Sequence, residues 1–237
     1  HILCEKPLTL NAKEAEEVVE YANSKGVKLM EAFMYRFHPK WKAVKELVEH
    51  GEIGNILSIH TVFSYSNNDP ENIRNIKDYG GGALMDIGCY AISTARYITG
   101  MEPKRVVGLS YYDPVFKTDI LSSGILDFGI TRCMFTAGTQ MFPQQEVTIF
   151  GSAGAITVTI PFNDFPDIKA KIIVQTGLKT REVEFDPVNQ YQLEFESFAE
   201  AVREGREVPV PPQDAINNMK VIDALVESAN KGTWIEL

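Results

Sequence analysis

Three residues in two short motifs of this chain are candidates for acid–base chemistry, namely Lys6, Asp86 and Tyr90. Lys6 follows Glu5 after a short apolar run in HILCEKP, and Asp86 and Tyr90 stand four residues apart in GGGALMDIGCYAIS. Ammonium, carboxylate and phenol groups can hold or move a proton at a reacting hydroxyl. Two simpler interpretations compete with this one: an ordinary surface Glu–Lys pair, and an Asp and a Tyr that serve only the core.

The elements that position Lys6 are predicted to form one strand–helix–strand unit. The apolar run ILC has the character of a buried strand, so Lys6 should emerge at its carboxyl end, where open α/β sheets bind ligands. Asn11 and Glu14 have the spacing of a capping box, and apolar residues follow at helical intervals up to Gly26. The stretch VKLMEAFMYRF then has the length of a second strand. Parallel pairing of the two strands would make this unit the tail of a nucleotide-binding domain.

Asp86 and Tyr90 fall in a predicted helix that ends at Gly100. Side chains four residues apart share a helix face, so these two can converge on one substrate. An earlier helix is signalled by Pro39 at its first turn and by Gly51 at its end. The alternating stretch NILSIHTVFSY and a long polar loop, NNDPENIRNIKDYGGG, separate the two helices.

The second half of the chain is dominated by predicted strands. Between Arg105 and Asp186 seven segments have strand character, separated by Gly, Pro, Asn and Asp, and they indicate a predominantly antiparallel sheet. Within this region FGSAGAI predicts a tight hairpin, because its glycines can supply positive φ. Two helical patterns follow, NQYQLEFESFAEAVREG and PQDAINNMKVIDALVESANKG. We therefore predict an α/β protein in which residues 1–37 complete a nucleotide-binding sheet and residues 38–237 form a second α/β domain.

Composition narrows the class of partner. The 237 residues are 44% hydrophobic and 23% charged, which is typical of a globular protein with one large or two small cores. A net charge of −9 without a basic cluster argues against nucleic acid and anionic membranes. No apolar run approaches the roughly 18 residues of a membrane span, and three cysteines without CxxC spacing argue against disulfides or zinc. We expect a cytoplasmic protein with small-molecule or protein partners.

Three stretches in order, EKP, EAFMYRFHP and GGGALMDIGCYAIS, resemble the glucose–fructose oxidoreductase, inositol dehydrogenase and rhizopine catabolism (Gfo/Idh/MocA) family. The resemblance covers nearly the whole chain and is greatest to the branch that contains dihydrodiol and D-xylose dehydrogenases. It implies a Rossmann-type end followed by an open-faced, mostly antiparallel mixed sheet with helices on one face. It also implies hydride transfer between NAD or NADP and a sugar, polyol or trans-dihydrodiol-like substrate.

The resemblance assigns roles to the three residues. Lys6 would lie beside the nicotinamide and the substrate hydroxyl, where an ammonium orients the hydroxyl and stabilises developing negative charge. Tyr90 would relay the proton, with the Lys6 ammonium favouring its ionised form. Asp86 would hold Lys6 or a substrate hydroxyl through charge-assisted hydrogen bonds.

Further residues and a partner follow from the same resemblance. Glu5 and Arg36 are candidates beside the cofactor, and Tyr191 is a candidate for substrate contact; an exposed hinge arginine is an equal alternative for Arg36. The triplet Gly80–Gly82 would allow close approach to a ligand or form a hinge. The uncovered sheet face implies a homodimer or tetramer.

The sequence leaves several questions open. No G-x-G-x-x-G occurs in the chain, so we expect most of the cofactor domain to be absent and the chain to be inactive alone. The sequence does not distinguish NAD from NADP, because the residue that recognises the ribose 2′ position is expected in the absent part of the cofactor domain. The alternatives are a sugar-binding regulatory protein without turnover, a nicotinamide-assisted glycoside hydrolase, and an inactive folded fragment.

Overall fold

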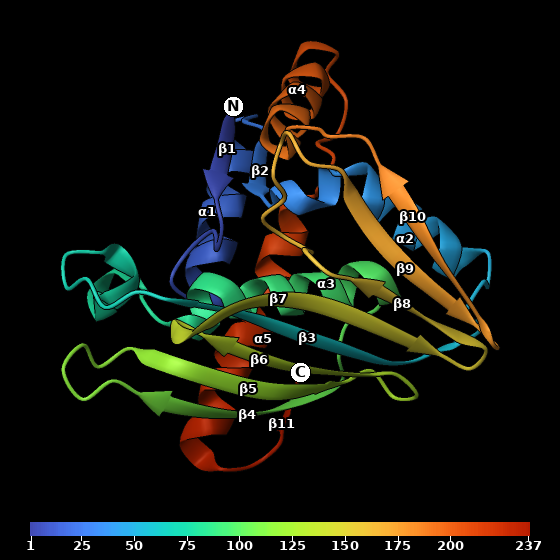
Figure 1. Ribbon diagram of the computed structural model, residues 1–237. Helices are drawn as coiled ribbons and strands as arrows, with labels where there is room; N and C mark the ends of the chain where they lie inside the picture. The colour runs from blue at the N-terminus through green and yellow to red at the C-terminus, as the bar shows by residue number, and fades with distance from the viewer.

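The computed structural model describes residues 1–237 and contains two β-sheets (Figure 1). In the smaller sheet two strands pair in parallel, and one helix connects them. This confirms the predicted strand–helix–strand order. The elements are β1 (Ile2–Glu5), α1 (Ala12–Ser24) and β2 (Leu29–Ala32).

The connecting helix α1 begins as its sequence predicts. The side chain of Asn11 accepts a hydrogen bond from the Glu14 amide, and the Glu14 carboxylate accepts one from the Leu10 amide. The first bond satisfies an amide of the first helical turn, and the second fixes the chain just before the helix. Helix α1 carries the chain back to β2, and the pairing of β2 with β1 holds the carboxyl end of β1 in place.

The larger sheet has nine strands in the order β10-β9-β8-β7-β3-β6-β5-β4-β11. Strands β3 and β6 run parallel and the other neighbours antiparallel, so the sheet is mixed and mostly antiparallel, as expected. The strands are β3 (Ile56–Ser66), β4 (Arg105–Tyr112), β5 (Asp119–Asp127), β6 (Arg132–Gly138), β7 (Gln140–Gly151), β8 (Gly154–Val158), β9 (Ala170–Thr176), β10 (Lys179–Phe185) and β11 (Ile235–Glu236).

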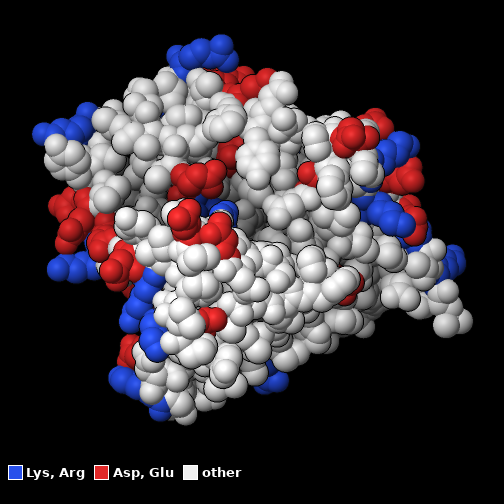
Figure 2. Space-filling model, turned by 60° about the vertical axis from the view of Figure 1, so that its left-hand side comes forward, with Lys and Arg blue, Asp and Glu red and all other residues white.

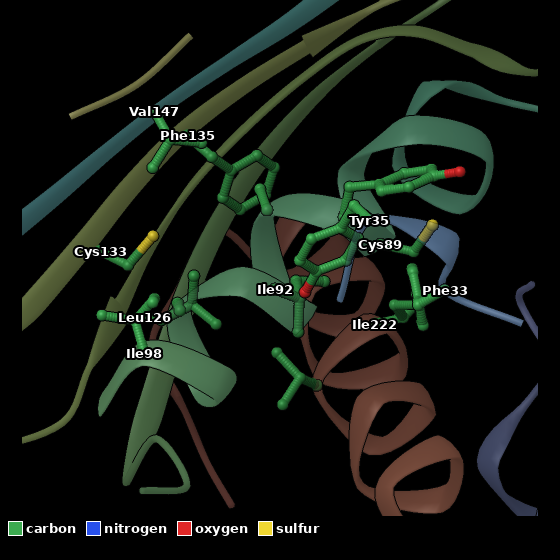
Figure 3. Packing of buried hydrophobic residues seen from close by; sticks show 14 of the residues in the cluster. Phe33, Tyr35, Cys89, Ile92, Ile98, Leu126, Cys133, Phe135, Val147 and Ile222 are labelled. Atoms are coloured by element: carbon green, nitrogen blue, oxygen red, sulfur yellow. The ribbon is translucent and has the colours of Figure 1, made fainter. Parts of the chain in front are cut away.

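Helices cover one face of the large sheet (Figure 1). The main core lies between that face and the helices, where Ile92, Leu126, Cys133, Phe135 and Ile222 are all nearly inaccessible to solvent (Figure 3). Burial of such side chains is the main favourable term in folding. The remaining α-helices are α2 (Pro39–Glu49), α3 (Cys89–Thr99), α4 (Gln190–Arg203) and α5 (Pro212–Lys231). None of the helices is both long and apolar enough to cross a membrane.

The opposite face of the large sheet carries exposed apolar side chains. Leu109 and Tyr111 of β4 are 75% and 63% exposed, and Met134 of β6 is 40% exposed. These residues alternate with inward-facing ones such as Val106 and Cys133, which are fully buried. The sheet is therefore open on one face, as the sequence predicts.

One local prediction is wrong. The stretch after residue 28 is not strand throughout, because β2 ends at Ala32 and a 3-10 helix spans Met34–Phe37. This turn lets Phe33, Met34 and Tyr35 all be buried, and the rings of Phe33 and Tyr35 pack edge-on with centroids 5.9 Å apart. The predicted helix that contains Asp86 is confirmed, and its first part is a π-helical turn, Leu84–Gly88, that leads directly into α3.

Candidate active site

Lys6 and Asp86, which are 80 residues apart in the sequence, are in direct contact. The ammonium of Lys6, just beyond the end of β1, donates to the backbone carbonyl of Asp86 and to its Oδ1 at 3.1 Å. Asp86 lies in the π-helical turn, and both side chains are only about a tenth exposed. A charged hydrogen bond at this distance joins the two residues that the sequence singled out.

Two further donors hold the other oxygen of the same carboxylate. The hydroxyl of Tyr65 donates to Asp86 Oδ2 at 2.7 Å, and Nε of Arg74 donates to it at 3.0 Å. Tyr65 comes from β3 and Arg74 from the polar loop that follows β3. The carboxylate is therefore held by one hydroxyl and two cations, and we call Lys6, Tyr65, Arg74 and Asp86 the carboxylate cluster.

The cluster fixes the charge state of its members. Burial alone would raise the pKa of Asp86, but the Lys6 ammonium, the Tyr65 hydrogen bond and Arg74 outweigh it and lower the pKa. Burial would likewise lower the pKa of Lys6, yet Cys89 and Asp86 raise it above its ordinary value. Burial raises the pKa of Cys89 to about 12, so its thiol is neutral near pH 7 and Asp86 is the effective counter-ion. Lys6 is a cation and Asp86 an anion at neutral pH.

The carboxylate cluster borders a cavity of about 1370 Å³, and all four of its residues line it. The space-filling view shows this part of the surface hollowed, with acidic groups on the rim and basic groups inside (Figure 2). The other walls carry amides and aromatic rings. They include Glu5, Asn67, Gln144, Gln145, Asn163, Phe165 and Tyr191.

Tyr90 also lines the cavity, but not in the way its predicted role needs. Its hydroxyl donates to the sulfur of Met34 at 3.4 Å, and the Lys6 ammonium lies over its ring, 4.8 Å from the centroid. Burial and neighbouring groups raise the pKa of Tyr90 well above its ordinary value. The expectation that Lys6 favours the ionised phenol is therefore wrong, because the cation meets the face of the ring rather than its oxygen.

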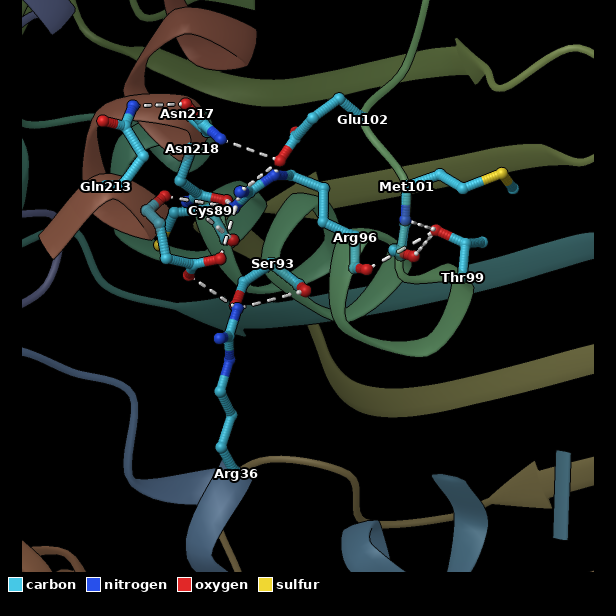
Figure 4. Close-up of polar contacts among 12 residues, drawn as sticks. Arg36, Cys89, Ser93, Arg96, Thr99, Met101, Glu102, Gln213, Asn217 and Asn218 are labelled. Atoms are coloured by element: carbon cyan, nitrogen blue, oxygen red, sulfur yellow. Dashed lines mark hydrogen bonds and ion pairs between the residues drawn. The ribbon is translucent and has the colours of Figure 1, made fainter. Parts of the chain in front are cut away.

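Arg36 does not lie at the cavity. It comes from the 3-10 helix rather than from a strand end, and its guanidinium points into a polar network between α3 and α5 (Figure 4). There NH2 contacts Asp214 Oδ2 and Ser93 Oγ, each at 2.8 Å, and the side chain is 9% exposed. Arg36 thus has a buried ion-pair partner away from the cavity, and its contact with the cofactor stays a prediction.

The other predicted residues have mixed outcomes. Glu5 and Tyr191 both line the cavity, so the structure brings them to the site. Of the glycine triplet, Gly80 and Gly82 have φ of 73° and 126°, where glycine is favoured. A Cβ at Gly82 would lie 1.9 Å from Asp119 Oδ1, so this glycine is required by contact with the protein's own side chain.

Comparison with known proteins identifies the family. The family model described as "Oxidoreductase family, C-terminal alpha/beta domain" matches residues 45–237. The model described as "Oxidoreductase family, NAD-binding Rossmann fold" matches residues 1–33. The chain belongs to the Gfo/Idh/MocA oxidoreductase family.

One curated relative and two solved structures are similar to the chain. D-xylose 1-dehydrogenase (NADP(+)) 2 of Haloferax volcanii is 36% identical over 244 residues, which cover all of this chain and 73% of that protein. Aldose–aldose oxidoreductase from Caulobacter crescentus, solved with glycerol, superposes with a TM-score of 0.92 at 24% identity, covering 100% of this chain and 72% of that one. KijD10, a 3-ketoreductase from Actinomadura kijaniata solved with NADP, superposes with a TM-score of 0.91 at 25% identity. The superposition covers 96% of this chain and 70% of KijD10.

The cofactor of this Gfo/Idh/MocA chain is NAD or NADP. The residues present fit its nicotinamide end. Lys6 stands at the carboxyl end of a parallel strand and lines the cavity, and two of its three ammonium protons are engaged by Asp86. One donor is thus left for a group bound in the cavity.

Sequence reasoning missed Tyr65 and Arg74. Both lie in segments that looked like ordinary strand and polar loop, and neither is at a helical spacing from Asp86. The one available signal was a tyrosine near the end of an alternating strand, followed by an arginine in a loop leading directly to the Asp86 motif. That signal places the residues close in sequence but does not show that they share one carboxylate.

Proposed function

We propose that this oxidoreductase transfers hydride between NAD(P) and a secondary or hemiacetal carbon of a sugar or polyol. The observation that carries the proposal is the Lys6–Asp86 pair, which places a cation with one free donor in a large cavity at the carboxyl end of β1. The 36% identical relative named as a D-xylose dehydrogenase supports a sugar as the substrate.

Lys6 would act on the reacting oxygen of the substrate. When bound, NAD(P) would supply the acceptor or donor of the hydride. As the carbon loses hydride, the proton of its hydroxyl passes to water in the cavity, and the Lys6 ammonium stabilises the negative charge that develops on that oxygen. In the reverse direction, the same ammonium donates a hydrogen bond to the carbonyl oxygen while water returns the proton to the forming hydroxyl. Asp86 keeps Lys6 charged and oriented for both directions, because its Oδ1 and carbonyl engage the other two ammonium protons.

Tyr90 would support Lys6 through its ring rather than its hydroxyl. The ring face lies beneath the ammonium, and the residue is 5% exposed. A cation over an aromatic face gains about 0.5–2 kcal/mol, the larger value where water is excluded. Tyr90 is therefore proposed as a wall of the site that favours the charged form of Lys6.

The rest of the cavity suits a polyhydroxylated substrate. Gln144, Asn163 and Asn67 offer amides, and Phe165 and Tyr191 offer aromatic surface at 55% and 44% exposure. Amides can both donate to and accept from sugar hydroxyls, while the rings pack against the apolar face of a sugar. We propose Tyr191 and Glu5 as substrate-side and cofactor-side residues of this cavity.

We also propose that two copies of the chain associate through the open face of the large sheet. Leu109 and Tyr111 of β4, Leu121 of β5 and Met134 of β6 place exposed apolar surface on three neighbouring strands. A monomeric protein rarely leaves a contiguous apolar patch of this kind facing water. Association would cover the sheet face opposite the helices without obstructing the cavity.

The decisive experiment measures NAD(P)-dependent turnover of a panel of aldoses, polyols and glycosides by the full-length protein and its Lys6→Ala variant. We expect oxidation of an aldose or polyol, reduced roughly 10²- to 10⁴-fold in the variant, as is usual for lost acid–base assistance. Lys6→Arg is the control that keeps the charge. Glycoside cleavage in place of oxidation, or sugar binding without turnover, would contradict the proposal, as would a folded Lys6→Ala variant with unchanged turnover.

A further inference from the structure

Tyr65 is a tyrosine whose hydroxyl belongs to the carboxylate cluster. It donates to Asp86 Oδ2 at 2.7 Å, while Lys6 takes the opposite oxygen, Oδ1, at 3.1 Å. The two oxygens of one carboxylate are thus assigned to two different elements, β3 for Oδ2 and the segment after β1 for Oδ1. Rotation of the Asp86 side chain would break both bonds together.

The second donor to Oδ2 is less able to fix the carboxylate. Arg74 extends from a loop, and its side chain is 45% exposed, so its ion pair with Asp86 is weakened by solvent and by mobility of the long side chain. Tyr65 stands on β3, which has a hydrogen-bonded neighbour on either side, β6 and β7. Burial and the nearby Asp86 raise the pKa of Tyr65, so its phenol remains a neutral donor across the working range of pH.

We propose that Tyr65 is a positioning residue of the hydride-transfer site, which holds the Asp86 carboxylate in the orientation that directs Lys6 toward the substrate. The inference rests on the proposed function. Tyr65 acts through Asp86: its hydroxyl fixes Oδ2, which leaves Oδ1 facing the Lys6 ammonium. It also favours the ionised carboxylate, because a hydrogen bond donated to the charged form stabilises that form.

The geometry separates Tyr65 from Tyr90. The hydroxyl of Tyr90 reaches only the sulfur of Met34, and its ring contacts Lys6. The hydroxyl of Tyr65 reaches the counter-ion of Lys6. Of the two tyrosines that line the cavity near Asp86, Tyr65 is therefore the one whose oxygen is coupled to the charge on Lys6.

Tyr65→Phe tests the inference because it removes only the hydroxyl. In the full-length protein we expect kcat to fall about ten- to a hundredfold, the usual effect of losing a hydrogen bond to a charged group, with the KM for NAD(P) unchanged. Tyr21→Phe is the matched control, since Tyr21 lies on α1 and is 66% exposed. A kcat equal to wild type, or an equal loss in the control, would overturn the proposal.

A double-mutant cycle separates positioning from a general loss of stability. In an Asp86→Ala background, Tyr65→Phe should change kcat less than twofold, because the group it acts through is gone. A purely structural effect would be the same in both backgrounds, including any loss caused by partial unfolding. That outcome would refute positioning even if the single variant is unstable.

A direct measurement does not depend on turnover. The pKa of Asp86 can be followed by carbon NMR of ¹³C-labelled aspartate, with the signal assigned by its loss in Asp86→Asn. Tyr65→Phe should raise this pKa, leaving Lys6 and Arg74 as the remaining charged partners. An unchanged pKa would overturn the proposed coupling. If wild-type protein oxidises no sugar, the proposed function fails, but this titration still decides whether Tyr65 controls Asp86.

Discussion

Replacing Arg36 with methionine distinguishes a structural cation from a cofactor contact. The Arg36 guanidinium contacts Asp214 and Ser93 at 2.8 Å, and its side chain is 9% exposed. Breaking a buried ion pair by removing one partner costs about 3–5 kcal/mol. Asp214 keeps a second cation, since Arg96 NH2 lies 3.0 Å from its Oδ1. We therefore expect a loss of stability at the lower end of this range, about 3 kcal/mol.

This loss is large enough to measure by thermal unfolding. For a chain of this size each kcal/mol moves Tm by about 2–4 °C, so Arg36→Met should lower Tm by about 6–12 °C. Cofactor affinity should be unchanged in the folded variant, because Arg36 does not line the cavity. Arg181→Met is the control: its ion pair with Glu52 is about half exposed and should contribute at most about 1 kcal/mol.

The measurement uses scanning calorimetry for stability and fluorescence titration of NAD(P)H for affinity, both on the full-length protein. Arg36→Lys should recover part of the lost Tm, because it restores the charge without the second hydrogen bond to Ser93. A variant with wild-type Tm and weakened cofactor binding would refute the reasoning. It would return Arg36 to the cofactor side of the site.

Four other outcomes follow from the structure. Tyr90→Phe should change kcat less than about threefold, because its hydroxyl contacts only a thioether; a hundredfold loss would restore the proton relay. Because the pKa of Lys6 is raised above 10.5, the ammonium persists and reduction should not decline between pH 7 and 9; a decline centred near pH 8 would contradict this. The pKa of Glu31 rises from 4.5 to about 7 mainly through burial, so its contribution to stability is present below pH 4.5 and lost as pH rises to about 7; Glu31→Gln should flatten unfolding free energy over that window. Light scattering should show a dimer, which Leu109→Asp should dissociate without lowering dehydrogenase turnover at high protein concentration. A wild-type monomer would exclude the proposed interface.

Much of the fold could be predicted because its signals are local. The helix starts at Asn11 and Pro39 and the stop at Gly100 depend on capping and backbone conformation within a few residues. The strands of the large sheet follow from short apolar segments between turn residues, and the seven predicted between Arg105 and Asp186 are all present. Local chemistry did not reveal that β3 joins β6 in parallel, since that pairing depends on how distant strands assemble.

One hairpin shows that a correct prediction can have a different cause. The turn between β7 and β8 forms as FGSAGAI predicts, and its glycines are strongly constrained. Positive φ is not the reason, because neither Gly151 nor Gly154 has it. A Cβ at Gly151 would lie 2.1 Å from the Ile53 carbonyl, and one at Gly154 would lie 2.2 Å from the Gln175 carbonyl. Close packing against other segments, which the sequence does not display, requires these glycines.

The sequence by itself determined the order of elements, the family resemblance and the choice of Lys6 and Asp86, because each depends on local patterns and short motifs and on their order along the chain. Only the tertiary structure decided which atoms meet. Lys6 and Asp86 are 80 residues apart, and the Tyr65 hydroxyl reaches the same carboxylate from a different strand. The directions of the Arg36 and Tyr90 side chains could not be predicted, because they are set by packing and by competing partners, Asp214 for Arg36 and Met34 for Tyr90. A motif identifies a chemical group, but only the fold determines the direction in which that group points.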